Sequence, residues 1–226
     1  MTELWADLWP GLLGAFWVTI KLTFFSAIGA FILGVILTAM RVSPVAILRS
    51  IARFYIETVR NTPLTLIILF CSIGLYQNLG LTLAPENDNF IKNNNFWLAV
   101  LAFVLYTSTF VAESLRSGIN TVHFGQAEAA RSLGLSFTQT FRFVVFPQAF
   151  KSAVVPLGNT LIALTKNTTI ASVIGVAEAS LLMKSTIENH ANHTILVFMI
   201  FALGFIIITL PMGLLFTRYT RRKAVA

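Results

Sequence analysis

The chain has 226 residues, of which 56% are hydrophobic and only 11% are charged, and its mean hydropathy is +0.79. Soluble domains carry about a quarter charged residues, so this composition excludes an ordinary soluble protein. The net charge of +7 would suit a nucleic-acid-binding protein, but the basic residues are scattered between apolar runs and do not gather on one polar face. We therefore expect the chain to contact a lipid bilayer and no nucleic acid.

The apolar runs predict an all-α integral membrane protein with a single domain, residues 1–226, and five transmembrane helices. The expected spans are 11–40, 51–79, 96–115, 149–183 and 195–216. A polar segment, 116–148, separates the third span from the fourth and is expected to be a loop that contains one short helix.

The first span follows a short leader, residues 1–10, and carries a stripe of small residues. Ser26, Ala30, Gly34 and Thr38 lie four residues apart, a spacing that lets another helix approach closely. Lys21 lies in the same span. It either extends to the outer surface or lines a transport path, and a long flexible side chain favours the first.

Polar residues interrupt two of the spans. In the second span, Pro63 removes a backbone donor and disfavours helix at Thr62, so we expect a kink or break there. The fourth span is expected to break at the polar run Lys166, Asn167, Thr168 and Thr169.

The distribution of Lys and Arg predicts the orientation in the membrane. Eleven basic residues fall on one side: Arg41, Arg49, Arg53, Arg116, Arg131, Arg142, Lys151, Arg218, Arg221, Arg222 and Lys223. Only Lys92 and Lys184 fall on the other side. Because basic residues are enriched on the cytoplasmic side, we expect the N-terminus outside and the C-terminus and segment 116–148 in the cytoplasm.

Two acid–base pairs lie near the cytoplasmic ends of spans. Glu57 with Arg60, and Glu113 with Arg116, are each three residues apart on one helical face. Charges at such depth face a protein interior or a watery cavity. Our hypothesis is that these pairs, beside the break at Thr62 and Pro63, hold an inner gate closed; the alternative is local salt bridges without further function.

The segment from Gly125 to Pro147 reads GQAEAARSLGLSFTQTFRFVVFP and is the longest polar interruption of the chain. Gly125 and Gly134 bracket a predicted short helix from Gln126 to Leu133. The spacing resembles the EAA loop of ABC-importer permeases, in which such a helix docks in a groove of the ATPase subunit. The resemblance assigns ATPase coupling to Gly125, Gln126, Glu128, Ala129, Ala130, Arg131, Gly134 and Pro147.

Two further segments narrow the resemblance. Residues 55–64 are similar to the Y-x-E-x-x-R-G-T-P-L segment of the polar amino-acid permeases, the histidine, glutamine and glutamate uptake family, with Asn61 in place of the usual Gly. Residues 109–119 are similar to A-Y-x-A-E-x-x-R-G-G-I of the same family, with Thr, Phe and Ser departing from it. The sequence of these segments is most similar to that of the glutamate-uptake members.

The polar run in the fourth span resembles the K-x-[ST]-[ST] element of the same family. Lys166, Asn167, Thr168 and Thr169, with Asn159 two turns earlier, are therefore candidates for the substrate path. A broken helix exposes the positive N-terminus of its second half, which suits an anionic group. The alternative is that Lys166 is structural and caps carbonyls, or pairs with Glu178 or with an acid on the partner permease.

The resemblance implies a non-catalytic permease subunit of an ATP-driven amino-acid importer of a bacterial cell membrane, with L-glutamate as substrate. It also implies ABC ATPase subunits, an extracytoplasmic substrate-binding protein and a second permease subunit, either a related chain or a second copy, as partners. The sequence has no Walker A pattern, so ATP hydrolysis is assigned to another chain. We expect no cofactor and no metal, because the three histidines are not accompanied by a set of other metal-ligating residues. The competing hypotheses are a secondary amino-acid transporter and a different polar substrate, glutamine or aspartate.

Overall fold

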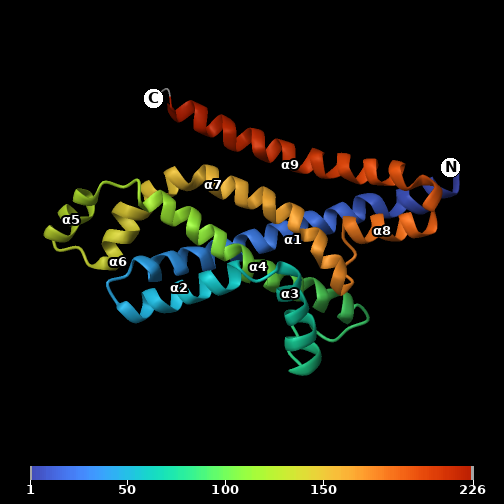
Figure 1. Ribbon diagram of the computed structural model, residues 1–226, viewed down its shortest axis with the longest axis horizontal. Helices are drawn as coiled ribbons and strands as arrows, with labels where there is room; N and C mark the ends of the chain where they lie inside the picture. The colour runs from blue at the N-terminus through green and yellow to red at the C-terminus, as the bar shows by residue number, and fades with distance from the viewer. Residues whose placement is uncertain (1, 225–226) are drawn as a thin grey trace.

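The computed structural model describes residues 2–224, with side chains for residues 2–218, and every regular element in that range is helical. Four helices set the long axis of the molecule: α1 (Thr2–Val42), α4 (Phe90–Ile119), α7 (Phe146–Asn167) and α9 (Thr194–Ala224). They lie along one direction, and the shorter helices gather at the two ends and on one side of this bundle (Figure 1).

Three helices are long and apolar enough to cross a membrane by themselves: Thr2–Val42, Phe90–Ile119 and Ala191–Arg218. Two bent pairs also pass the test if each counts as one span. They are Ala46–Arg60 with Leu64–Asn78, bent by 103°, and Phe137–Ile174 with Ala179–Asn189, bent by 57°. These five helical units correspond in order to the five expected spans, whose membrane boundaries stay predictions. The basic side chains of Arg221, Arg222 and Lys223 lie outside the described residues.

The stripe of small residues on α1 is the surface against which α4 packs. Ser26, Ala30 and Thr38 are buried. A Cβ atom on Gly34 would lie 2.5 Å from Val111 Cγ1 of α4, far inside van der Waals contact. The close helix–helix approach that the spacing predicts is therefore confirmed.

The first ten residues are not a separate leader, and this expectation is wrong. Helix α1 runs unbroken from Thr2 through Pro10. Leu4 and Leu8 lie one turn apart on one face and are fully buried against α8 (Ala179–Asn189) and α9. This burial stabilises the helical conformation of a segment whose tryptophans alone suggested an interfacial leader.

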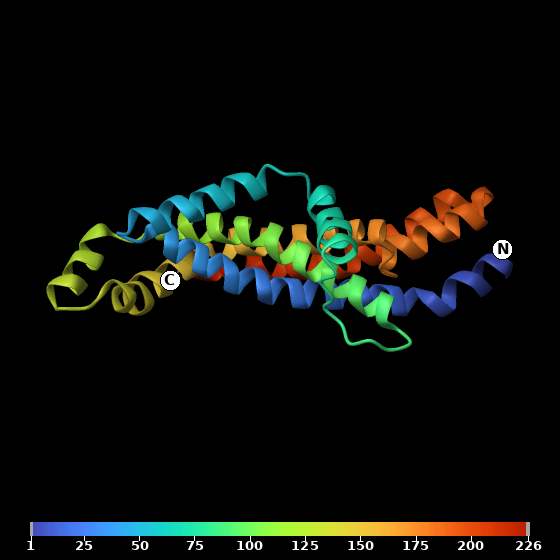
Figure 2. The ribbon, with the colours of Figure 1, turned by 90° about the horizontal axis from the view of Figure 1, so that it is seen from below.

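The helix break at Pro63 lies where the sequence predicts it. Helix α2 (Ala46–Arg60) ends three residues before Pro63, and α3 (Leu64–Leu69) begins directly after it and continues as the π-helix η1 (Phe70–Asn78). Because the bend is sharp, α3 and η1 cross the long axis of the bundle (Figure 2).

Segment 116–148 is mostly helical. It contains the end of α4, then α5 (Phe124–Ser132), α6 (Phe137–Thr140) and the π-helix η2 (Phe141–Val145), and it ends in the first turn of α7. Beyond α7 the chain continues as the 3-10 helix η3 (Thr168–Ile174), then α8, then the short η4 (Ala191–His193). The connections on either side of α5 and α8 are therefore only a few residues long.

The main apolar core lies where α1, α3, α4 and α7 meet. Its fully buried large side chains include Leu22, Ile68, Leu98, Phe103 and Leu164. This apolar core fills the middle of the bundle, and the charged side chains therefore lie toward its two ends.

Candidate coupling, gating and substrate sites

Helix α5 lies at the end of the molecule opposite the N-terminus, between α4 and α7 (Figure 1). It begins after His123, whose Nδ1 accepts a hydrogen bond from Gly125 N at 3.3 Å. It ends just before Gly134, which has φ +86°. This left-handed conformation reverses the chain after the helix at little cost only for a glycine. The two glycines expected to flank the helix, Gly125 and Gly134, thus lie at its two ends.

Helix α6 is fixed by a capping box. Ser136 Oγ accepts from Gln139 N at 3.3 Å, and Gln139 Oε1 accepts from Ser136 N at 2.8 Å. These reciprocal bonds satisfy two backbone donors at the helix start. They give the connection between α5 and η2 a defined conformation, so it is not a flexible loop.

The predicted coupling residues form an exposed face on α5. Gln126, Glu128, Ala129 and Arg131 are exposed, and Ala130 is buried beneath them. In the described part of the chain neither Glu128 nor Arg131 lies within ion-pair distance of an opposite charge, so both remain available to a partner.

Two further contacts attach this region to α7. Gln148 Nε2 donates a hydrogen bond to Gln126 Oε1 and another to Val144 O at 3.0 Å. Pro147 is the second residue of α7, which follows the π-helix η2 without a break in helical conformation. Gln148 therefore links the start of α5 to the start of α7.

Sequence reasoning missed two apolar residues at the ends of α5. Phe124 is 77% exposed and Leu133 is 82% exposed. Large apolar side chains with such exposure on a polar segment indicate a surface that a partner covers. The available signal was a large apolar residue directly beside each bracketing glycine.

A cavity of about 870 Å³ lies between α5, α6 and the ends of α1 and α4, on the side of α5 that carries Glu128 and Arg131. Glu128, Arg131, Phe137 and Thr140 line it. Helix α5 is therefore not packed tightly against the bundle along its length, and it has room to move relative to α4.

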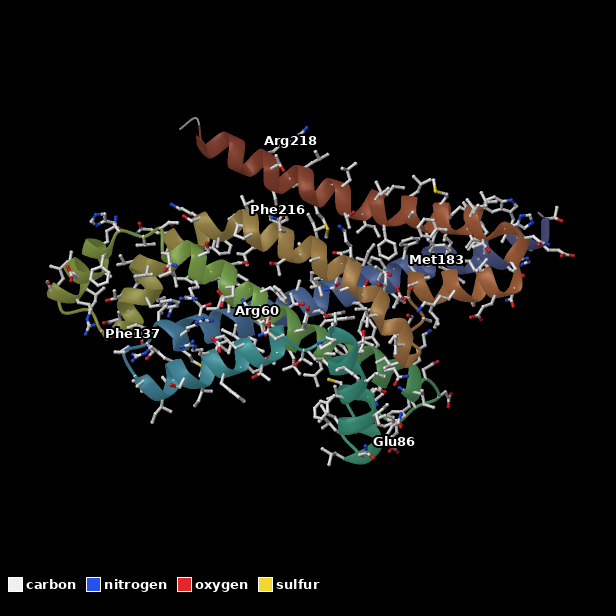
Figure 3. The ribbon with its side chains drawn as sticks, in the orientation of Figure 1. Arg60, Glu86, Phe137, Met183, Phe216 and Arg218 are labelled. Atoms are coloured by element: carbon white, nitrogen blue, oxygen red, sulfur yellow. The ribbon has the colours of Figure 1, made fainter. Side chains whose placement is uncertain are left out.

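A cluster of charges joins the ends of three helices. Arg41 Nη1 of α1 donates to Glu113 Oε1 of α4 at 2.6 Å. Arg116 Nη1 lies 3.6 Å from Glu113 Oε2, as the three-residue spacing predicts, and Arg60 Nη1 of α2 lies 4.0 Å from Oε1. We call these four residues the arginine cluster. Figure 3 shows Arg60 at the end of α2, where that helix meets α4.

The expected pairing of Glu57 with Arg60 is wrong. Glu57 Oε1 instead accepts from Arg53 Nε at 2.8 Å, and both side chains are largely exposed. The four-residue spacing brings Arg53 onto the same exposed face of α2, whereas Arg60 turns toward Glu113. Arg41, which sequence reasoning placed only in a loop, makes the closest contact of the arginine cluster.

The helix break expected at Lys166 to Thr169 is only a change of helix type. Helix α7 continues to Asn167, and hydrogen bonding persists as 3-10 helix through Ile174. The sharp turn follows at Gly175, which has φ +76°. The two threonines of this run donate to their own turn, Thr168 Oγ1 to Thr165 O at 2.7 Å and Thr169 Oγ1 to Lys166 O at 2.8 Å. These hydrogen bonds are made to nearby backbone carbonyl groups, so the polar run fits into the helix without a break.

The positive N-terminus of the following helix is not free for a substrate anion. Glu178 is fully buried and caps α8, since its carboxylate accepts from Ser180 N at 2.8 Å and from Leu181 N at 3.0 Å. The chain thus supplies its own cap at this helix end. Glu178 does not pair with Lys166, so that pairing, one form of the structural alternative for Lys166, is wrong.

The remaining candidate residues of the substrate path lie on α7 and at its end. Asn159 and Lys166 are exposed, whereas Asn167 and Thr169 are half-buried and Thr168 is fully buried. Asn159 lines a cavity of about 340 Å³ between α7 and α9. In the described part of the chain Lys166 has no carboxylate within ion-pair distance, which leaves its ammonium group available.

The sequence matches known transport proteins over nearly its whole length. Residues 30–225 match the family described as binding-protein-dependent transport system inner membrane component. The glutamate transport system permease protein GluC of Corynebacterium glutamicum is 74% identical over 226 residues, covering 100% of this chain and 99% of that protein. The protein of the same name from Corynebacterium efficiens is 73% identical with the same coverage.

The fold also matches a solved transporter. The crystal structure of an amino acid ABC transporter with histidines has a chain that superposes with a TM-score of 0.78 at 31% identity, covering 94% of both chains. The all-helical bundle with α5 at one end, the family match and this superposition agree. The chain therefore belongs to the inner-membrane component family of binding-protein-dependent transport systems and is a non-catalytic permease subunit of an ABC importer.

Proposed function

We propose that this chain, paired with a second permease subunit, forms the membrane path of an importer for L-glutamate that a separate ATPase drives. The assignment of L-glutamate as the substrate rests on the 74% identity, over nearly the full length of both chains, to a permease named for glutamate transport. The second subunit is a related chain or a second copy, as in the expectation from the sequence.

The ATPase docks on the exposed face of α5. The proposed contact consists of Glu128, Arg131 and the two exposed apolar residues Phe124 and Leu133. Helix α5 connects α4 to the segment that leads into α7, so a displacement of α5 pulls on both long helices. The cavity that Phe124, Glu128 and Arg131 line, between α5 and the ends of α1 and α4, gives this displacement room. Coupling then requires no chemistry on this chain, only the transfer of motion.

The membrane orientation follows from the same assignment. The ATPase and α5 are cytoplasmic, so the N-terminus of α1 lies outside and the C-terminal end of α9 lies inside. The positive-inside bias supports this independently. The binding protein delivers substrate to the opposite end, at 80–95 and 184–194.

The arginine cluster holds the inner gate closed. It ties the last turns of α1 and α2 to α4 at the end that faces α5. Opening the inner side separates these helix ends and lengthens the contacts to Glu113. Because Glu57 pairs only with the exposed Arg53, we remove Glu57 from the gate and keep it as a local salt bridge. Thr62 and Pro63 provide the break that lets α2 end at the cluster.

The substrate path includes Lys166 and Asn159, two exposed polar residues of α7. An ammonium group free of local carboxylates suits a substrate that carries two carboxylates. Asn167 and Thr169 flank Lys166, and the buried Thr168 keeps the turn in place through its bond to Thr165.

The test is ATP-dependent uptake of labelled glutamate by the complete reconstituted complex. Glu128→Arg reverses a charge on the proposed ATPase contact, and Glu3→Arg makes the same change on an exposed residue at the opposite end of α1. We expect the first variant to assemble and lose coupled uptake, and the second to transport like wild type. Unlabelled glutamine, aspartate and arginine serve as competitors.

Each outcome is informative. Equal transport by both variants would refute α5 as the coupling contact. If glutamine or aspartate competes better than glutamate, the coupling assignment survives and the substrate is corrected. Lys166→Ala adds a separate arm, in which full glutamate uptake with normal assembly refutes its role in the path.

A further inference from the structure

A small cavity that contains two lysines lies between α1, the start of α4 and the turn before α8. Its volume is about 250 Å³, and Lys21 and Lys92 both line it. Among residues 2–218 neither lysine has a carboxylate within ion-pair distance. We call this feature the lysine cavity. It concentrates two positive charges that no part of the described chain neutralises.

The walls of the lysine cavity are aromatic. Phe25 of α1 packs against Trp97 of α4 with ring centroids 5.2 Å apart, and Phe96 and Trp97 lie edge to face at 5.4 Å. The ammonium group of Lys21 lies 5.8 Å from the Phe96 ring centroid, which favours a cation at that position. Phe25 and Trp97 are each 38% exposed, so the aromatic wall is open on one side.

The depth of the lysine cavity can be derived from the helices that carry it. Lys21 and Arg41 are 20 residues apart on the unbroken helix α1, which corresponds to about 30 Å, the thickness of the hydrocarbon core. No charged residue lies between them. On α4, Lys92 and Glu113 also bracket an uncharged stretch, of 20 residues (93–112). The lysine cavity and the arginine cluster therefore lie at opposite faces of one apolar slab.

A cation pair beside Trp and Phe at the edge of this slab is at the depth of lipid headgroups, where aromatic side chains and lysines are enriched. The outward face of α1 continues from the cavity into the slab with exposed apolar side chains. Phe24 is 59%, Ile28 is 47% and Ile32 is 55% exposed, one above the other at helical spacing. A headgroup site thus leads directly onto a track that an acyl chain can cover.

We infer that the lysine cavity binds the phosphate of an anionic phospholipid, with Lys21 and Lys92 on the phosphate oxygens and the acyl chain along α1. The lipid braces α1 against the start of α4. The leaflet is the outer one under the orientation proposed above, while the binding itself does not depend on transport or on its substrate. A free anion has no use for the apolar track, which is why the occupant is assigned as a lipid.

The experiment measures lipid contact at Trp97 in the full-length permease within its complex. Trp5, Trp9 and Trp17 are replaced by Phe, and fluorescence quenching by brominated phosphatidylglycerol is compared with quenching by brominated phosphatidylcholine in nanodiscs. We expect phosphatidylglycerol to be preferred, and Lys21→Gln and Lys92→Gln each to reduce the preference roughly fivefold, since each lysine near a membrane surface contributes about that factor. Lys151→Gln, an exposed lysine elsewhere, is the charge-matched control and should change nothing.

Lys21→Arg and Lys92→Arg keep the charge and should keep most of the preference, which separates lost binding from a folding defect. If the tryptophan replacements impair assembly, native mass spectrometry of the otherwise wild-type complex counts phosphatidylglycerol retained with and without the two Gln substitutions. Equal quenching by the two lipids, or a preference unaffected by both Gln substitutions, overturns the inference. Displacement by millimolar inorganic phosphate reassigns the cavity to a free anion, and displacement by glutamate reassigns it to the substrate path.

Discussion

The arginine cluster gives the sharpest test of the gating mechanism, through the substitution Glu113→Gln. This change keeps the shape of the side chain and one acceptor oxygen but removes the charge that three arginines face. Arg41 Nη1 and Glu113 Oε1 are 2.6 Å apart, and the two side chains are 16% and 29% exposed. Exposed ion pairs contribute up to about 1 kcal/mol, and breaking a buried one costs about 3–5 kcal/mol.

The cluster lies between these two cases. Arg116 and Arg60 are 3.6 and 4.0 Å from Glu113 and are 45% and 40% exposed, so solvent screens most of their share. We therefore expect Glu113→Gln to cost the closed gate about 2 kcal/mol, which is roughly a 30-fold shift toward the open state. The free energy lost should come mainly from the contact with Arg41.

The assay is ATP-independent counterflow of labelled glutamate through the reconstituted complex, together with its basal ATPase rate. Glu113→Gln should raise the counterflow and lower the uptake obtained per ATP. Glu57→Gln is the matched control, because it makes the same chemical change in an exposed pair whose partner, Arg53, lies on the same helix. We expect that control to be indistinguishable from wild type.

A double-mutant cycle then assigns the effect to one contact. If Arg41→Gln and Glu113→Gln act through the same hydrogen bond, the double variant should be little worse than either single variant. Additive effects would mean that the two residues act separately. Wild-type counterflow in an assembled Glu113→Gln complex would refute the gating role altogether.

Three further predictions concern the frame that holds α5. Gly118→Ala should lower the thermal unfolding temperature and the uptake, because the new Cβ would lie 2.1 Å from the backbone oxygen of Ala149 and force α4 away from α7. Its control is Gly14→Ala, where nothing lies within 4 Å of the new Cβ, and this variant should behave like wild type. Gly134→Ala should cost about 1–2 kcal/mol from its φ of +86° alone, since space around it is open, and should show as reduced coupling with normal assembly. Ser136→Ala removes one bond of the capping box and should cost about 1 kcal/mol of α6 stability, measurable as faster amide exchange in α6 while α9 is unaffected.

Features that depend on near neighbours in the chain could be predicted from the sequence. The predicted helix from Gln126 to Leu133 differs by only one or two residues from α5. The stop at Gly134 depends on the backbone freedom of one residue, and the break at Pro63 depends on one missing donor. In each case the cause lies within a turn of its effect.

Features that depend on distant residues could not be predicted in the same way. The contact between Arg41 and Glu113 joins residues 72 apart in the chain, and no local spacing rule detects it. The same rule favoured Glu57 with Arg60, although Arg53 lies on the same face and offers the better geometry. Helical spacing shows which charges are able to pair, but the packing of α1, α2 and α4 decides which of them do.

The buried cap on α8 limits where the substrate's charge can be recognised. A helix N-terminus inside a membrane protein attracts an anion, and the polar run before it suggested that this anion is the substrate. Glu178 already fills that place, since its carboxyl oxygens accept from Ser180 N and Leu181 N and are shielded from solvent. A substrate carboxylate at the same end would find these two backbone donors already occupied. Recognition of a dicarboxylate on this chain must therefore come from a free cation, and Lys166 on α7 is a candidate that meets this condition.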